Sequence, residues 1–173
     1  MQIRPEFNLG PHHIPGPVRG FIGWLVLTFA AAGLGALATT DASSFYAQLA
    51  KPSWAPPGSV FGPVWSALYL LMAISAWLVW RKRGFASAPR TLALFIVQLV
   101  ANAAWSWLFF NWKLGAYAFA EVLVLWLLVA ATTIAFRRVR PMAGALMLPY
   151  LAWVTFACAL TFATWRLNPH LLG

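Results

Sequence analysis

The chain has 173 residues and a formal net charge of +9, yet only 9% of its residues are charged, whereas 62% are hydrophobic and 16% are aromatic. Its mean hydropathy is +0.74. Ordinary soluble domains carry roughly 25% charged residues, so this composition excludes a water-soluble globule and a disordered chain. The single cysteine, Cys158, excludes a disulfide scaffold.

The charged residues occur in blocks, and the stretches between the blocks are long enough to cross a membrane. Four stretches contain no Asp, Glu, Lys or Arg, and a fifth contains only Glu121. A helix needs about 20 residues to cross the hydrocarbon core, and it satisfies its backbone hydrogen bonds within its own segment. We therefore expect an all-α membrane protein, a bundle of five transmembrane helices near residues 20–39, 63–80, 91–110, 115–136 and 142–165.

Two tails flank the expected transmembrane domain, which covers residues 20–168. Residues 1–19 are rich in Pro and Gly, which favours an irregular tail, and residues 169–173 form a short C-terminal tail. The first apolar run is longer than the hydrophobic region of a signal peptide, so we expect it to be retained. His12 and His13 lie in the first tail without further ligands nearby. We expect no metal, no cofactor and no catalytic residue.

The basic residues are distributed unequally between the two faces of the expected bundle. Nine lie on one face, namely Arg4, Arg19, Arg81, Lys82, Arg83, Arg90, Arg137, Arg138 and Arg140, and three lie on the other, namely Lys51, Lys113 and Arg166. Cytoplasmic loops carry the excess of Lys and Arg, so we expect the N-terminus in the cytoplasm. Basic helix flanks also match anionic lipid headgroups, which explains the high pI without nucleic-acid binding.

The connection between the first two helices, residues 40–62, differs from the other loops. It is rich in proline, and Pro52, Pro56, Pro57 and Pro63 prevent a helix from running through the region. Trp54 and Tyr46 belong to this stretch. The two aromatic residues either form part of an interfacial belt or belong to a stiff loop that covers a ligand site at one end of the bundle.

Three of the expected helices carry a stripe of aromatic, polar and small residues at helical spacing. The stripes are Trp65, Tyr69, Met72 and Ala76 in the second, Gln98, Asn102, Trp105, Ser106 and Phe109 in the third, and Tyr150, Trp153, Ala157, Leu160 and Thr164 in the fifth. The stripes either pack as core, with Gln98 and Asn102 joining helices, or line a cavity for a large, planar, mainly apolar ligand. Glu121, the only acid within a span, is a further candidate for a functional site.

At these residues the chain resembles the translocator protein family, also called the tryptophan-rich sensory protein family or the peripheral benzodiazepine receptor family. The resemblance covers roughly residues 20–168. Its motifs are KPSWAPPGSVFGPVWSALY at 51–69, QLVANAAWSWLFF at 98–110, the acid of the fourth helix followed by LW, PYLAWVTFACAL at 149–160 and WRLN at 165–168. These blocks are long, and they occur in the family's order and spacing.

The resemblance implies a five-helix bundle, usually dimeric, whose pocket opens toward the first loop and binds porphyrins, sterols and benzodiazepine-type drugs. By motif, it implies that the pocket is formed by Trp65, Tyr69, Asn102, Trp105, Trp153 and Ala157, with Trp54 and Tyr46 in the covering loop. The sterol-recognition pattern of animal members lacks its tyrosine, since this chain has Thr161 and Phe162 there, although Arg166 is present.

Two functions remain open on these grounds. The first is an integral multi-pass membrane receptor or carrier for a porphyrin or haem-type tetrapyrrole, located in the cell membrane of a bacterium rather than its outer membrane. The second is an enzyme that degrades protoporphyrin oxidatively in light. The spans show no metal-ligand cluster, nucleophile with a base, or glycine-rich nucleotide motif, which favours the receptor or carrier. A scaffold or channel, in which the stripes only pack, is the remaining alternative.

Overall fold

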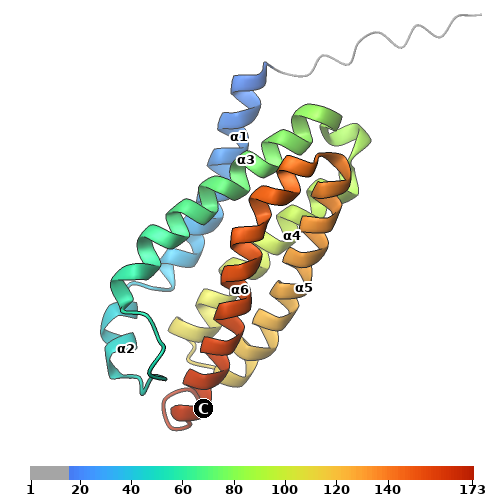
Figure 1. Ribbon diagram of the computed structural model, residues 1–173. Helices are drawn as coiled ribbons and strands as arrows, with labels where there is room; N and C mark the ends of the chain where they lie inside the picture. The colour runs from blue at the N-terminus through green and yellow to red at the C-terminus, as the bar shows by residue number, and fades with distance from the viewer. Residues whose placement is uncertain (1–15) are drawn as a thin grey trace, which may run out of the picture.

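The computed structural model describes residues 16–173, and this part of the chain is built of helices. Their order is α1 (Pro17–Leu37), α2 (Ala42–Gln48), η1 (Gly58–Val60), α3 (Phe61–Ser87), α4 (Pro89–Ser106), η2 (Trp107–Asn111), α5 (Gly115–Val139) and α6 (Pro141–Leu167). Five of the described helical stretches are long and apolar enough to cross a membrane. The predicted fold class, a bundle of five transmembrane helices, is confirmed (Figure 1).

The helices extend beyond the charge-free stretches from which they were predicted. The first helix starts at Pro17 rather than at residue 20, and α3 continues to Ser87, past its three consecutive basic residues. Hydropathy marks only the part of a helix that lies in lipid, whereas its hydrogen bonds continue into the headgroup region. Proline occupies the first turn of α1, α4 and α6, where the missing N–H costs nothing. Gly84 interrupts α3 with φ 66°, a conformation that a side chain disfavours.

The loop predicted at residues 40–62 contains two short helices, α2 and η1. Between them, Pro52, Pro56 and Pro57 occupy non-helical backbone, in agreement with the sequence analysis. Pro63 differs, because it lies in the first turn of α3. A proline is tolerated there since the first N–H groups of a helix have no intrahelical acceptor. The connection therefore folds over one end of the bundle (Figure 1).

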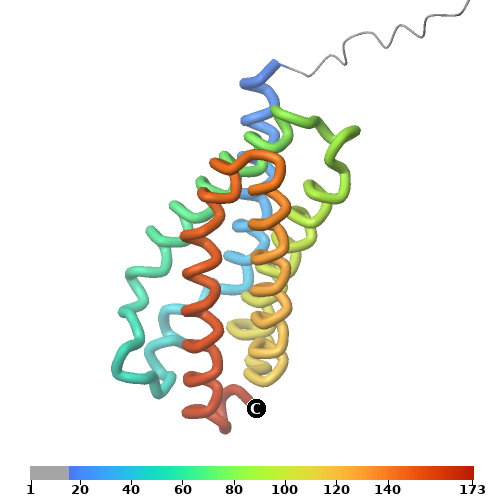
Figure 2. Tube along the Cα trace, turned by 45° about the vertical axis from the view of Figure 1, so that its right-hand side comes forward, coloured from blue at the N-terminus to red at the C-terminus, as the bar shows by residue number. Residues whose placement is uncertain are grey.

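The spanning helices form a ring in the order α1, α3, α6, α5 and α4, in which α4 also contacts α1. The core of this ring is filled by large side chains with no exposed surface, including Met72, Phe95, Phe136, Met147 and Tyr150. Figure 2 shows that α3 leans away from α1 toward the end of the bundle that carries α2. The ring is consequently closed by side chains at one end and hollow at the other.

The closed end holds α1 tightly against α3. The indole Nε1 of Trp77 donates a hydrogen bond to the carbonyl oxygen of Pro17 at 2.9 Å, and the ring of Phe21 meets Trp77 edge-on at 5.5 Å. The indole of Trp80 lies where a Cβ on Gly20 would be. The basic residues of the described loops 81–90 and 137–140 share this end, and Lys51, Lys113 and Arg166 lie at the opposite end.

Candidate ligand-binding cavity

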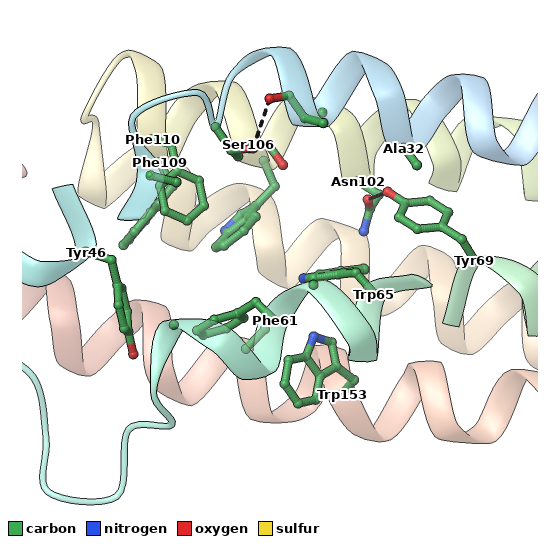
Figure 3. A pocket seen from close by; sticks show the side chains of 18 of the residues that line it. Ala32, Tyr46, Phe61, Trp65, Tyr69, Asn102, Ser106, Phe109, Phe110 and Trp153 are labelled. Carbon is green, nitrogen blue, oxygen red and sulfur yellow. Dashed lines mark hydrogen bonds between the residues drawn. The ribbon is translucent and has the colours of Figure 1, made fainter. Parts of the chain in front are cut away.

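A cavity of about 590 Å³ occupies the hollow end of the ring. Side chains of α1, α3, α4 and α6 form its walls, and residues of α2, η1 and η2 close the end that faces the loop (Figure 3). Ligand pockets for drug-sized molecules have volumes of about 300–1,000 Å³, so the cavity is large enough for a bulky ligand.

The structure brings together the six residues that the family motifs assigned to the pocket. These six line the cavity: Trp65, Tyr69, Asn102, Trp105, Trp153 and Ala157. Tyr46 lines it as well; this residue belongs to the connection of residues 40–62, here called the covering segment. That a ligand binds there stays a prediction.

Trp54 is the exception, because it is not among the residues that line the cavity. A backbone hydrogen bond from Ala55 to Pro52 turns the segment, and the Trp54 side chain remains 48% exposed. Its indole meets the ring of Phe156 edge-on at 5.7 Å, and Phe156 does line the cavity. Trp54 thus belongs to the covering loop, as the resemblance implied, and it contacts the cavity wall through Phe156. That Trp54 binds a ligand stays a prediction.

Aromatic rings cover two facing walls of the cavity (Figure 3). On one side Trp65 lies between Tyr69 and Trp153, with ring centroids 5.7 and 6.4 Å away. On the other side Trp105 stacks on Phe109 at 5.3 Å with an angle of 14° between their planes. Since the planes of Trp65 and Trp153 are 85° apart, the space offers both faces and edges of aromatic rings to an apolar guest.

A hydrogen-bonded chain of side chains forms the inner end of the cavity. The Tyr69 hydroxyl donates to Oδ1 of Asn102 at 2.5 Å, Nδ2 of Asn102 donates to the Tyr150 hydroxyl at 2.9 Å, and that hydroxyl donates to Oε1 of Gln98 at 3.1 Å. The chain joins α3, α4 and α6. Gln98 and Tyr150 are fully buried behind the cavity, so Gln98 serves helix packing, whereas Asn102 serves both packing and the cavity wall.

Two buried polar atoms on cavity-lining residues have no hydrogen-bond partner, the indole Nε1 of Trp105 and the hydroxyl of Thr164. Both carboxylate oxygens of Glu121 also lack a partner, but Glu121 is not among the lining residues. Its predicted role at the site stays a prediction. Cys158 is a free thiol that donates to the carbonyl oxygen of Val122 at 3.6 Å.

Small residues of α1 form a wall that the sequence analysis did not identify. Ala32, Gly33, Gly35 and Ala36 all line the cavity. Small residues four apart along a spanning helix are also typical of helix–helix contacts, and hydropathy does not distinguish the two uses. The sequence alone therefore carries no signal that assigns these residues to a cavity wall rather than to a helix–helix contact.

Hydrogen bonds fasten the covering segment over the end of the bundle. The backbone N–H of Ala50 donates to Oδ1 of Asn168, and Nδ2 of Asn168 donates back to the Ala50 carbonyl, both at 2.8 Å. Lys51 donates to the carbonyl oxygens of Tyr46 and Leu49 at 2.7 and 2.9 Å. Tyr46 donates to the Pro56 carbonyl at 2.9 Å, and burial raises the pKa of its phenol, which keeps it a neutral donor.

Within residues 16–173, no group of three or more His, Cys, Asp and Glu side chains could hold a metal ion. His12 and His13 lie outside the described residues. The cavity therefore offers aromatic surface, a few hydroxyl and amide groups, and no charged side chain among its lining residues. This chemistry suits binding of a planar apolar molecule.

These features define an integral, multi-pass helical membrane protein with an aromatic cavity inside its bundle. The chain belongs to the TspO/MBR family, which it matches over residues 24–166. The predicted family resemblance is thus confirmed.

Three relatives illustrate the range of the family. The tryptophan-rich sensory protein of Cereibacter sphaeroides is 45% identical over 148 residues, which cover 83% of this chain and 91% of the relative. The translocator protein of Homo sapiens is 41% identical over 126 residues, 72% of this chain and 75% of the relative. The tryptophan-rich protein TspO of Chlorobaculum tepidum is 37% identical over 132 residues, 74% and 82% of the two chains.

Proposed function

We propose that this protein is a membrane receptor or carrier that binds a tetrapyrrole of the porphyrin or haem type in the cavity. The observation that carries the proposal is the aromatic lining of the cavity, to which Trp65, Trp153, Trp105 and Phe109 contribute. A porphyrin macrocycle is flat and mostly apolar, so it can stack between indole rings. Its polar substituents can meet the hydroxyl and amide groups at either end.

Two polar groups on cavity-lining residues support a ligand that carries acceptor oxygens. Trp105 Nε1 and the Thr164 hydroxyl lack partners within the protein, and burial of an unpaired donor costs about 1–3 kcal/mol. Both atoms are buried, so a ligand with acceptor oxygens would recover that free energy only after the side chain rotates toward the cavity. The Asn102 amide is already engaged with two tyrosine hydroxyls, so it contributes mainly by shaping the inner wall.

Binding is tested by titrating the purified protein in lipid nanodiscs with protoporphyrin while tryptophan fluorescence is recorded. We expect saturable quenching, because three indoles lie on the cavity wall. Free tryptophan mixed with empty nanodiscs is the control, for which quenching should rise linearly with the protoporphyrin concentration. The same linear rise with the protein would contradict the proposal.

The alternative is an enzyme that degrades protoporphyrin oxidatively in light. The specific observation in its favour is the presence of the Trp65, Trp105 and Trp153 indoles on the cavity wall, because an indole can exchange an electron with an excited macrocycle. The same titration, repeated under illumination in air and followed by product analysis, separates the two. A recovered, unchanged porphyrin supports the receptor or carrier, and one defined product that requires the three indoles supports the enzyme.

A sterol is a weaker candidate for the same site than a porphyrin, because this chain has Thr161 and Phe162 where the sterol-recognition pattern requires a tyrosine. Thr161 is buried and lines the cavity, whereas Phe162, at the adjacent position, is 45% exposed and packs against Phe119 at 5.0 Å. The Arg166 guanidinium lies over the Trp165 ring. Benzodiazepine-like drugs carry aromatic rings and are mainly apolar, and they would use the same aromatic walls as the porphyrin.

We also propose a homodimer in the bacterial cell membrane with the N-terminus in the cytoplasm. The orientation follows from the unequal distribution of Lys and Arg between the two ends of the bundle. The homodimer follows from the family resemblance. Cross-linking in nanodiscs and in cells tests it, and a monomer at all protein concentrations would contradict it.

A further inference from the structure

The cavity is continuous with a groove on the lipid-facing side of the bundle. This outer groove lies between α1 and α3 and is lined by Leu25, Val26, Phe29, Ser66, Ala67 and Leu70. Phe29 and Ser66 line both the outer groove and the cavity. The two spaces therefore adjoin at these two side chains, one from each helix.

The passage between α1 and α3 is lined by residues with little side chain. Gly33 of α1 and Gly62 of α3 both line the cavity, and both are exposed. A Cβ built on either glycine meets no atom within 4 Å. Among the cavity-lining residues of α1, Phe29 is the only one with a large side chain. It is 41% exposed, and its ring lies 6.2 Å from that of Tyr69.

The divergence of the two helices produces this passage. Near the opposite end, α1 and α3 are held together by Trp77, which bonds to Pro17 and contacts Phe21. Toward the cavity α3 leans away from α1, as Figure 2 shows. The outer groove lies between residues of these two helices and shares Phe29 and Ser66 with the cavity.

The end of the cavity that faces water is more firmly closed. The covering segment is fastened to the end of α6 by two reciprocal hydrogen bonds between Ala50 and Asn168, and Lys51 and Tyr46 add three more within the segment. Access from water would require several of these bonds to break. Access from the bilayer requires only that Phe29 change rotamer, a movement that exposed side chains complete in nanoseconds.

We propose that the ligand of the cavity enters and leaves laterally, from the lipid, through the passage between α1 and α3 at Phe29 and Ser66. The proposal rests on the proposed function, in that the ligand is a planar, mainly apolar molecule such as a porphyrin. A molecule of that chemistry partitions into the bilayer, where it is presented to the outer groove. The covering segment then acts as a fixed cap rather than as a gate.

Gly33→Phe tests the passage by placing a ring in it. Space is available at Gly33, so the variant should fold. Gly23→Phe is the matched control, because Gly23 is also an exposed glycine of α1 with no neighbour within 4 Å, and it lines neither the cavity nor the outer groove. Ser66→Phe, on the facing helix, provides a second obstruction of the same passage.

The measurement is stopped-flow fluorescence. In one arrangement, vesicles preloaded with protoporphyrin are mixed with nanodiscs that contain the protein. In the other, protoporphyrin is already present in the bilayer of those nanodiscs. Gly33→Phe and Ser66→Phe should each slow association and dissociation by about tenfold, which corresponds to about 1.4 kcal/mol in the barrier. Because Gly33 and Ser66 also line the cavity, the association rate, and not Kd, is the readout of the passage. Gly23→Phe should match the wild type.

Asn168→Ala tests entry from water past the covering segment, because it removes both hydrogen bonds between Ala50 and Asn168. Unchanged association in this variant agrees with lateral access, and faster association overturns it. Rates in Gly33→Phe and Ser66→Phe that equal the wild type also overturn it, as does a change in dissociation alone. A wild-type protein that binds no protoporphyrin at all contradicts the proposed function instead, so the two failures are distinguishable.

Discussion

Replacement of Asn102 by leucine removes the amide that joins three helices at the inner end of the cavity. In the wild type this amide accepts a hydrogen bond from Tyr69 and donates one to Tyr150. After the substitution the Tyr69 hydroxyl has no protein acceptor, but Tyr69 borders the cavity, where water can replace the lost partner. Tyr150 is fully buried and keeps only its bond to Gln98.

The expected cost follows from these contacts. A buried group that loses one partner costs about 1–3 kcal/mol, and interhelical hydrogen bonds measured in membranes average about 0.6 kcal/mol with a maximum near 1.7. Since one of the two tyrosines can be solvated and the other keeps a partner, we expect a loss of about 1–2 kcal/mol in the free energy of unfolding.

The assay is reversible unfolding in mixed detergent micelles, followed by far-UV circular dichroism, for Asn102→Leu, Tyr150→Phe and the double variant. Removal of the Tyr150 hydroxyl leaves no buried oxygen for Asn102 to satisfy, so the double variant should be less destabilised than the sum of the single variants. Ser106→Ala is the control, since Ser106 also lines the cavity on α4. Additive effects within about 0.3 kcal/mol, or no loss of stability in Asn102→Leu, would refute the role assigned to the network.

The remaining predictions concern the walls of the cavity and the orientation of the bundle. Trp65→Leu and Trp153→Leu should each weaken protoporphyrin binding by about three- to tenfold, because an aromatic contact contributes about 0.5–1.5 kcal/mol beyond its buried area; unchanged affinity of the folded fraction in both variants would show that the indoles only pack. Ala157→Phe places a ring in the cavity and should reduce the affinity without loss of the helical signal, and an affinity equal to the wild type would place the ligand elsewhere. Reporter fusions within residues 81–90 should be active in the cytoplasm and fusions after Gly173 outside it, and cytoplasmic activity after Gly173 would contradict the orientation.

The helices could be predicted from the sequence because the bilayer imposes one simple condition on each of them. A span must carry about 20 apolar residues, and the charged residues other than Glu121 delimit five such stretches. The ends of the helices could not be predicted in the same way. Helix α3 continues through Arg81 to Arg83, before Gly84 interrupts it, because backbone hydrogen bonds do not stop where lipid does.

The aromatic part of the site was predictable from helical spacing and from the family motifs. Trp65 and Tyr69, and likewise Trp153 and Ala157, lie four residues apart, so each pair shares a face, and the structure places all four on the cavity wall. What spacing could not determine was the ring order α1, α3, α6, α5 and α4. This order depends on how the covering segment returns α3 beside α1, which is a tertiary property.

Two features of the site depend on packing that leaves no pattern in a single sequence. The position of Trp54 is set by a turn at Pro52 and by contact with Phe156, which lies more than 100 residues away in the chain. The wall of α1 consists of small residues such as Gly33, whose role is to leave space. An absent side chain gives no hydropathy signal, so this wall was visible only in the structure.

A structure of the protein with protoporphyrin bound, determined in nanodiscs by electron cryomicroscopy with a rigid binding partner to add mass, tests the central claim most directly. The account predicts density for one macrocycle per chain inside the bundle, between Trp65 and Trp153 on one side and Trp105 and Phe109 on the other. Density for the porphyrin only on the outer surface of the helices, with the cavity filled by lipid or water, would contradict it.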